Sequence, residues 1–527
     1  MKKHFLTAAF LLSAMLASQM SLTAAAEDAG DIILISPNPN AAQTETDTDG
    51  VNSLMQNRYE ELAGMYSYDG VASRLYSLRV LLGDGVNFNL DQLPDRQQAC
   101  VMVVRMRGEE AAALAAYQAG EITCPFTDVT DEWVKPYLAW LYDKEIVLGT
   151  GEGKFGNSVC TPEMYITFML RALGYTVAWD PNSGDGEWPD VFYGDVRNFA
   201  RSLHLWDELL EAEPAFNRGV MSAVTYQTLA ANVKGEENRL LSVLAQAGAI
   251  DADMAQPILE LYDKVDAAAA LELASVPLTD GAMRLTGEMV QDEYQILSAI
   301  GTPEGDVTET AYGGLTFDVG MDFTEGKSEL AVNGEMKVTA SGTDMTVPLG
   351  MWVKDGCVYV DYMDQKLKAD ASDVEGLEAL TSAFGDLSMM FDDTGYQYYT
   401  VSDVTITVFD AEDGEGVTGT EIVYDATDFM WPIIAAQTDT EGFTAAADLS
   451  ALVATKKLLD ENGVLACVYN GMYAMISETD AESGILYSAE SLVESTVTYT
   501  AWGEDAVLTF PDFSQFLDMT GGEPSAE

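Results

Sequence analysis

Acidic side chains are the most abundant chemically active groups in this chain. Its 527 residues include 86 Asp and Glu against 26 Lys and Arg, a formal net charge of −60. Two neighbouring carboxylates can hydrolyse a glycosidic bond, and Asp392 with Asp393, or Glu412 with Asp413, would be such pairs. Because so many acids make adjacent pairs common by chance, we expect no catalytic residue, and a carboxylate-dependent hydrolase acting on glycans is the alternative. The charge also excludes a nucleic-acid partner, since phosphates would meet uncompensated carboxylates.

Histidine and cysteine are too scarce for most other catalytic chemistry. His204 is the only histidine outside the predicted signal peptide, so a mechanism with two imidazoles is excluded. The cysteines are odd in number and unevenly spaced, unlike a disulfide framework or a paired CxxC metal site: Cys100, Cys124, Cys160, Cys357 and Cys467. We expect most of them to be buried, with a Cys100–Cys124 or Cys124–Cys160 bridge as the alternative. We therefore expect no metal and no cofactor, and a protein that is not an enzyme.

The first 26 residues have the pattern of a secretory signal peptide. Two lysines precede an apolar run from Phe5 to Ala17, and small residues end at Ala26. The run of ~13 residues is shorter than the ~20 that span a bilayer, and no later stretch is apolar enough to span. We expect a secreted chain without a membrane span.

Three similar helix-loop-helix units follow. The clearest copy contains, in chain order, Phe126-Thr127-Asp128-Val129, Trp133, the loop glycines Gly149, Gly151 and Gly153, Phe155, Thr161 and Arg171-Ala172-Leu173-Gly174. Pro162 of copy two has the position that Arg96 has in copy one and Arg218 in copy three, and the second helix of copy two is expected to open at Thr161. Three units in one register indicate an internal repeat.

These repeats resemble the S-layer homology (SLH) family, whose pattern is F-x-D-V, tryptophan, glycine loop, phenylalanine, T-R-A-E and R-A-L-G. The resemblance is strong for residues 126–174 and moderate for the other two copies, and it covers about 40% of the chain. It implies an all-α, pseudo-threefold module that binds a secondary cell-wall polymer or peptidoglycan-linked polysaccharide. The residues that it implies in the carbohydrate-binding grooves are Arg96, Arg218, Asp128, Trp133, Gly149 and Gly151.

The chemistry of such a groove fits the residue types. An arginine fork can bind the carboxylate of a pyruvylated sugar with two parallel hydrogen bonds, and tryptophan rings pack on sugar faces. Copy two departs from the pattern, because Pro162 replaces the arginine. Arg96 and Arg218 could instead serve a structural role at a helix start. We expect Trp133, Trp140 and Trp188 to pack in the core or between repeats, with contact to a sugar as the alternative.

The second half of the chain has a different pattern. It has no arginine after Arg284, and residues 328–370 alternate apolar and polar side chains as an antiparallel meander does. Further strands are expected at 404–409, 418–424, 466–477, 484–487, 495–501 and 506–510, with covering helices at 374–384 and 446–461. This pattern resembles LolA/LppX-like half-barrels, which implies an apolar face for an amphiphilic ligand.

Methionines could line such a face or fill an ordinary core: Met345, Met351, Met363, Met389, Met390, Met472 and Met475. The alternatives to a small ligand are a partner protein and a structural spacer.

We therefore predict a multidomain α plus β protein. Its expected parts are a signal peptide (1–26), a disordered leader (27–52), three SLH-like repeats (53–251, as about 53–115, 124–178 and 186–251), a helical connector (252–285), a β-rich domain (286–516) and a disordered tail (517–527). We expect it to be attached non-covalently to the cell wall or S-layer at the cell surface, where it displays a binding or interaction domain.

Overall fold

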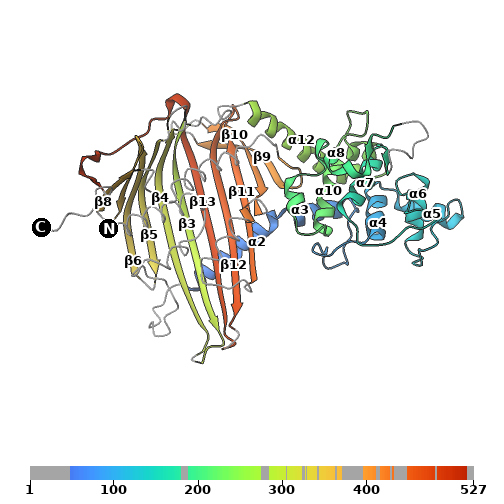
Figure 1. Ribbon diagram of the computed structural model, residues 1–527, viewed down its shortest axis with the longest axis horizontal. Coiled ribbons are helices and arrows are strands. Elements are labelled where there is room, and N and C mark those ends of the chain that lie inside the picture. The colour runs from blue at the N-terminus through green and yellow to red at the C-terminus, as the bar shows by residue number, and fades with distance from the viewer. Residues whose placement is uncertain are drawn as a thin grey trace. The chain divides into compact units, whose positions relative to one another are not determined.

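The structure is a computed structural model (Figure 1). It describes residues 48–518 except 180–187, 275–283, 304, 323, 325–326, 328, 341–342, 363–364, 371–395, 411–415, 428–429, 432–447 and 481–482. The chain forms two compact units. A helical unit contains residues 65–267 and 396–404, and a β unit contains the residues up to 64, 268–395 and 405 onward.

The helical unit is built from short helices. Their bounds are α3 Ser67–Ser77, α4 Arg96–Met106, α5 Glu110–Ala119, α6 Lys135–Asp143, α7 Pro162–Ala172, α8 Val196–Ser202, α9 Glu208–Ala212, α10 Arg218–Ala230, α11 Leu240–Gln246 and α12 Ala252–Ala274, of which α12 continues into the β unit. Between residues 65 and 267, the described part of the helical unit contains two strands, β1 Val177–Ala178 and β2 Val191–Phe192, which form a parallel pair.

Polar caps fix where the second helix of each repeat begins. Asp95, Thr161 and Asn217 stand immediately before α4, α7 and α10, and each side chain accepts a hydrogen bond from the backbone N–H three residues on. Such a cap satisfies a donor that the first helical turn leaves without a partner. The shared register is confirmed, because Arg96, Pro162 and Arg218 are each the first residue of their helix, and Thr161 is the cap of α7.

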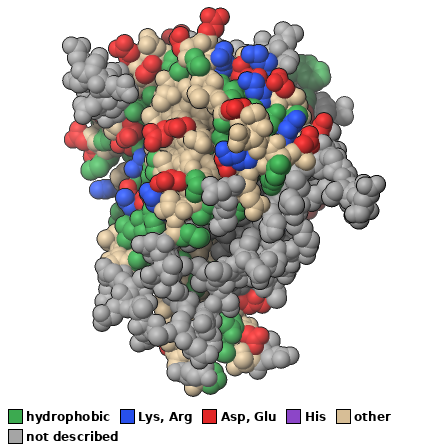
Figure 2. All heavy atoms as spheres, turned by 90° about the vertical axis from the view of Figure 1, so that its left-hand side faces the viewer, with side chains coloured by type: hydrophobic (Ala, Val, Ile, Leu, Met, Phe, Trp, Pro, Cys, Tyr) green, Lys and Arg blue, Asp and Glu red, His purple; other side chains and the backbone are tan. Residues whose placement is uncertain are grey.

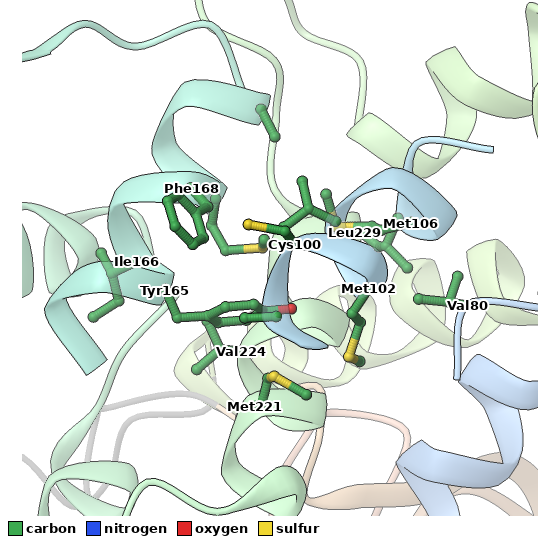
Figure 3. Close-up of a cluster of buried hydrophobic side chains, with 14 of the residues drawn as sticks. Val80, Cys100, Met102, Met106, Tyr165, Ile166, Phe168, Met221, Val224 and Leu229 are labelled. Atoms are coloured by element: carbon green, nitrogen blue, oxygen red, sulfur yellow. The ribbon is translucent and has the colours of Figure 1, made fainter. Parts of the chain in front are cut away.

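The helices close on one another in cyclic order. The second helices α4, α7 and α10 contact one another, while α4 packs on α6, α7 on α8 and α10 on α3. Each second helix thus meets the first helix of the next repeat, and the third returns to the first. Figure 3 shows the core between them, where Tyr165 of α7 lies beside Met102 and Met221. Its hydroxyl lies 2.7 Å from Thr225 Oγ1.

The cysteines form no disulfide. All five are free thiols, and Cys100 and Cys160 are buried in the helical core. Burial raises the pKa of the Cys160 thiol to about 12, against the weaker opposite influence of Arg96. The other three cysteines are half-buried.

The β unit contains one large antiparallel sheet. The described strands have the order β14-β8-β7-β6-β5-β4-β3-β13-β12-β11-β10-β9, and the long strands lie side by side in Figure 1. Among the strand pairs of this sheet whose register the described residues define, only the short β14–β8 pair is parallel. The bounds are β3 Arg284–Ile300, β4 Val307–Asp322, β5 Glu329–Ala340, β6 Thr343–Lys354, β7 Cys357–Tyr362, β8 Gln365–Asp370, β9 Val401–Asp410, β10 Gly416–Asp425, β11 Asp448–Leu459, β12 Leu465–Thr479, β13 Leu486–Trp502 and β14 Leu517–Asp518.

The two faces of this sheet differ. Side chains alternate along each strand, so the pairing assigns every residue to one face. The apolar face carries a buried cluster from β3 to β8: Leu285, Met289, Leu315, Phe317, Val319, Met321, Leu330, Val332, Met336, Val347, Leu349, Met351, Val353, Val358, Val360, Leu367 and Ala369.

The opposite face, here called the tyrosine face, is partly covered by two other segments. Helix α2 (Thr48–Met65) lies against β12, where Gly471 leaves room for Leu62. At the other end of the sheet, Phe513 and Phe516 near the C-terminus pack on Trp352 and Tyr359. Figure 2 shows that basic side chains on the surface lie among acidic ones.

Some sequence-based boundaries were wrong. The predicted helix at 446–461 is strand β11, because pairing with β10 and β12 along its length outweighs its helix-compatible spacing. Residues 506–510 form no strand. Helix α2 begins inside the expected leader and groups with the sheet rather than with repeat one. The predicted signal peptide and the helix at 374–384 lie outside the described residues.

Candidate binding sites

Arg96 is held by its own chain. Its side chain is 6% exposed and donates from Nη1 to the carbonyl oxygens of Phe155 and Gly156. Its guanidinium also lies 4.6 Å from the centre of the Phe155 ring. These contacts join the start of α4 to the glycine loop of the next repeat, so they favour the structural role for Arg96.

Asp128 holds the same loop from the other side. Its two carboxylate oxygens accept hydrogen bonds from the backbone N–H groups of Phe155 and Gly156, each at 2.8 Å. Gly149 has a positive φ, and a Cβ there would lie 2.5 Å from the Lys154 carbonyl oxygen. Gly151 also has a positive φ, with open space around it. The structure therefore brings Arg96, Asp128 and the loop glycines together.

Arg218 has the equivalent position at the start of α10, but it keeps more of its donor capacity. Its backbone N–H donates to the Gln92 carbonyl oxygen. Its side chain is half-buried, and Nε has no hydrogen-bond partner in the part of the chain that the structure describes. Burial lowers the guanidinium pKa, and the Asp84 carboxylate acts against that shift. Arg218 is thus the better candidate for an external carboxylate.

Three tryptophans of the helical unit are exposed. The exposed fractions are 57% for Trp133, 77% for Trp179 and 82% for Trp188. The expectation of packing is therefore wrong for Trp133 and Trp188, whereas Trp140 packs against the core as expected and donates to Glu109. At the junction between repeats two and three, where Pro162 replaces the arginine, Glu163 of α7 is paired with Arg197 at 2.6 Å.

The β unit contains a row of polar side chains that the sequence did not reveal. Thr455, Asn470, Ser495 and Gln291 are successive register partners on β11, β12, β13 and β3. They therefore point to one face of the sheet, about 5 Å apart from strand to strand. We call these four residues the polar row. Each is at most 5% exposed.

Three adjacent members of the polar row have polar atoms without a partner. Thr455 donates to Asn470 Oδ1 at 2.7 Å. Gln291 Oε1, Ser495 Oγ and Asn470 Nδ2 are buried without a hydrogen-bond partner among the described residues. A buried polar atom without a partner costs about 1 to 3 kcal/mol, so three in contact are unfavourable unless something else binds them.

The polar row continues directly into the apolar cluster. Gln291 pairs with Leu315 of β4, Leu315 with Met336 of β5, and Met336 with Val347 of β6. All three apolar partners are buried. One line across seven strands is thus polar at one end and apolar at the other.

Two charged residues flank this line, and both are engaged. On the apolar face, Lys457 lies two residues beyond Thr455 and pairs with Glu272 at 3.2 Å. Glu293, two residues beyond Gln291, accepts a hydrogen bond from Gln295 Nε2 at 2.6 Å and one from Ser491 Oγ at 3.4 Å. Both charged side chains therefore have partners outside the polar row.

Only some of the predicted methionines lie on the apolar face. Met351 and Met472 are buried there, and Met289, Met321 and Met336 are buried members that the prediction left out. Met345 is 47% exposed, and Met475 points to the tyrosine face. Met363, Met389 and Met390 lie outside the described residues.

Comparisons with known proteins give only distant similarities. No family model and no curated protein matches the chain. Solved structures do match. LprF from Mycobacterium bovis is 14% identical, with 47% of this chain and 97% of that chain covered and a TM-score of 0.23. Lipoprotein LppX from Mycobacterium tuberculosis is 13% identical, with 46% and 99% covered and a TM-score of 0.22.

A putative outer membrane lipoprotein-sorting protein domain from Vibrio parahaemolyticus also matches, with 8% identity, 48% and 95% covered and a TM-score of 0.09. Two of these three structures are thus a lipoprotein and a lipoprotein-sorting protein domain, and each of the three matches about half of this chain. The SLH resemblance has no counterpart in these comparisons. No helix among the described residues has the length and apolar character needed to cross a membrane.

Proposed function

We propose that the β unit binds an amphiphilic molecule on its apolar face. The observation that supports this is the single line across the sheet that changes from Asn470, Ser495 and Gln291 to Leu315, Met336 and Val347. An amphiphile has the same division, so its apolar chain would replace apolar contacts and its polar end would supply the missing hydrogen bonds.

Binding on this face requires it to open, because its side chains are buried. The polar row lowers the cost of that opening. Its three unpartnered atoms gain hydrogen bonds as soon as water or a ligand reaches them, whereas an apolar row would lose its burial without compensation. The apolar methionines beside it have flexible side chains that can adapt to a bound chain.

The experiment is native mass spectrometry of the full-length protein purified from its source, followed by organic extraction. We expect a bound amphiphile that organic solvent removes. A protein that carries none, and that binds no added single-chain amphiphile, would contradict the proposal. Turnover of a glycan panel would favour the alternative hydrolase.

A second proposal concerns the helical unit. We propose that it holds the exported protein non-covalently at the cell surface by binding a cell-wall polysaccharide. The exposed rings of Trp133, Trp179 and Trp188 support this, because exposed tryptophans bind sugar faces. The half-buried Arg218, with an unpartnered Nε, supports recognition of a carboxylate on the polymer.

Sedimentation of the full-length protein with purified cell-wall sacculi tests this second proposal. Losing one partner of a desolvated charged hydrogen bond costs ~2 to 5 kcal/mol, so Arg218→Ala should weaken binding at least tenfold. Pro162→Ala should change binding little, because repeat two has Pro162 in place of the carboxylate-binding arginine. Protein that stays in the supernatant at low and moderate salt, or equal effects of the two substitutions, would contradict the proposal.

A further inference from the structure

We propose that the polar row selects an uncharged polar group that can both donate and accept hydrogen bonds, such as a hydroxyl or a carboxamide, at the end of an apolar chain. This inference rests on the proposed function of the β unit and names the chemical class of its ligand. It follows from the kinds of atom that are left without partners and from the charges around them.

The unpartnered atoms are of mixed kind. Gln291 Oε1 is an acceptor, Asn470 Nδ2 is a donor, and Ser495 Oγ between them can do both. The hydrogen bond from Thr455 to Asn470 Oδ1 makes Nδ2 the free donor of Asn470, and Gln291 Oε1 supplies an acceptor, so the row presents both kinds to a ligand. Only a group that also has both kinds satisfies all of these atoms at once.

A charged group would satisfy only part of the row. A carboxylate or phosphate only accepts, so it would leave Gln291 Oε1 facing a negative charge. An ammonium only donates, so it would leave Asn470 Nδ2 facing a positive charge. In a buried setting, each such mismatch adds to the cost of removing the charge from water.

The neighbouring charges do not change this preference. Lys457 is the nearest cation on the row's face, and it is paired with Glu272. Glu293 on the other side already accepts hydrogen bonds from Gln295 and Ser491. At long range, the formal charge of −60 opposes an anion.

The test compares three probes that share one C18 chain: 1-monooleoylglycerol, which is uncharged, oleate and oleylamine. Binding to the full-length protein is measured at pH 7 in low and in high salt, since salt screens the long-range field. We expect monooleoylglycerol to bind at least tenfold more tightly than either charged probe, and the preference to persist in high salt.

The substitutions Gln291→Met, Ser495→Ala and Asn470→Leu remove the unpartnered atoms but keep the volume similar. Thr455→Val is made with them, because Asn470→Leu alone would take away the acceptor of the Thr455 hydroxyl. We expect two opposite effects. The melting temperature of the free protein should rise by about 2 to 4 °C, because buried unpartnered atoms are removed. Affinity for monooleoylglycerol should fall at least tenfold and become similar to that for oleate in high salt. Thr496→Ala, next to Ser495 but on the tyrosine face, is the matched control and should change neither.

The outcomes separate the two proposals. If none of the three probes binds, the β unit does not bind such amphiphiles and both proposals fail. If all three bind equally, or a charged probe binds best, the β unit binds amphiphiles but the polar row does not select an uncharged group. A lower melting temperature in the variant with all four substitutions, with the probe preference unchanged, would show that the row has only a structural role.

Discussion

The two faces of the large sheet treat polar side chains in opposite ways. On the tyrosine face, Tyr469 donates to Glu494 and Tyr473 to Glu490, at 2.7 and 2.9 Å, and Tyr312 donates to Asp292. On the apolar face, three adjacent polar side chains have atoms without a partner in the described parts of the chain.

This difference shows which polar groups the chain pairs internally and which it leaves without a partner among the described residues. The polar groups of the tyrosine face pair with each other across neighbouring strands, which is how cross-strand pairs stabilise a sheet. The polar row has the same cross-strand adjacency, but the described residues show only one hydrogen bond within it, from Thr455 to Asn470. Stability alone would favour apolar residues there, so the row points to binding.

The largest expected effect on stability comes from placing a charged side chain on one face of the sheet or on the other. Val347 is buried on the apolar face, and Thr346 next to it is exposed on the other. Val347→Asp should lower the free energy of unfolding by about 4 kcal/mol or more, because it buries a carboxyl group without a partner. Thr346→Asp should change it by about 0.5 kcal/mol at most, since it faces Lys337 across the strands. Denaturant unfolding measures both, and equal losses would contradict the division of the faces.

The next effect concerns the pairing on the tyrosine face. Tyr312→Phe removes the hydrogen bond to Asp292 and should cost about 1 to 2 kcal/mol of unfolding free energy. Tyr487→Phe is the control, because Tyr487 is 41% exposed, and it should cost about 0.5 kcal/mol at most.

The Tyr312–Asp292 hydrogen bond should also make the stability of the sheet fall at alkaline pH. Burial first, and then the hydrogen bond to Asp292, raise the pKa of Tyr312 above its ordinary value near 10. The unfolded phenol releases its proton near pH 10, so the stabilisation is complete below that pH and is lost as the pH rises through the raised folded pKa. Unfolding measured above pH 10 should show a shallower loss in Tyr312→Phe than in the parent protein. An unchanged slope would count against the pairing.

The smallest expected effect is at helix α2. Arg58 pairs with Glu61 at 2.6 Å and with Glu494 at 3.2 Å, but its side chain is 40% exposed. Arg58→Ala should therefore cost about 0.2 to 1 kcal/mol, and the difference should shrink in high salt. A larger loss that salt does not reduce would show that the arginine stem, rather than its charge, holds α2 on the sheet.

The sequence predicted local features well and long-range ones poorly. The starts of α4, α7 and α10 follow from caps and spacing within about ten residues, and the meander follows from alternation. The helix expected at 446–461 was wrong because Leu449, Leu452 and Val453 also fit a helical spacing, and only pairing with distant strands decides between the two.

The polar row illustrates the same limit at a site. Within each strand, Gln291, Asn470 and Ser495 are single polar residues two positions from an apolar one, which is a weak signal. Their adjacency depends on the register of β3, β12 and β13, which the sequence does not state. Arg96 is different, because it contacts the loop at Phe155 and Gly156 in the next repeat. The repeat spacing predicts that Arg96 lies near that loop, but it does not predict whether the guanidinium is bound by the loop or available to a ligand.

The pairing of β3 with β13 determines when the sheet can be completed. Leu285 pairs with Trp502 and Ile300 with Leu486, so the first long strand meets the last one near the middle of the sheet. A contact between such distant parts of a chain forms slowly, because a long loop must close first. Until β13 arrives, β3 and β12 each keep an open edge, and open edges promote aggregation. A chain that stopped before Leu486 would therefore hold two incomplete sheets, with Gln291 in one and Asn470 in the other.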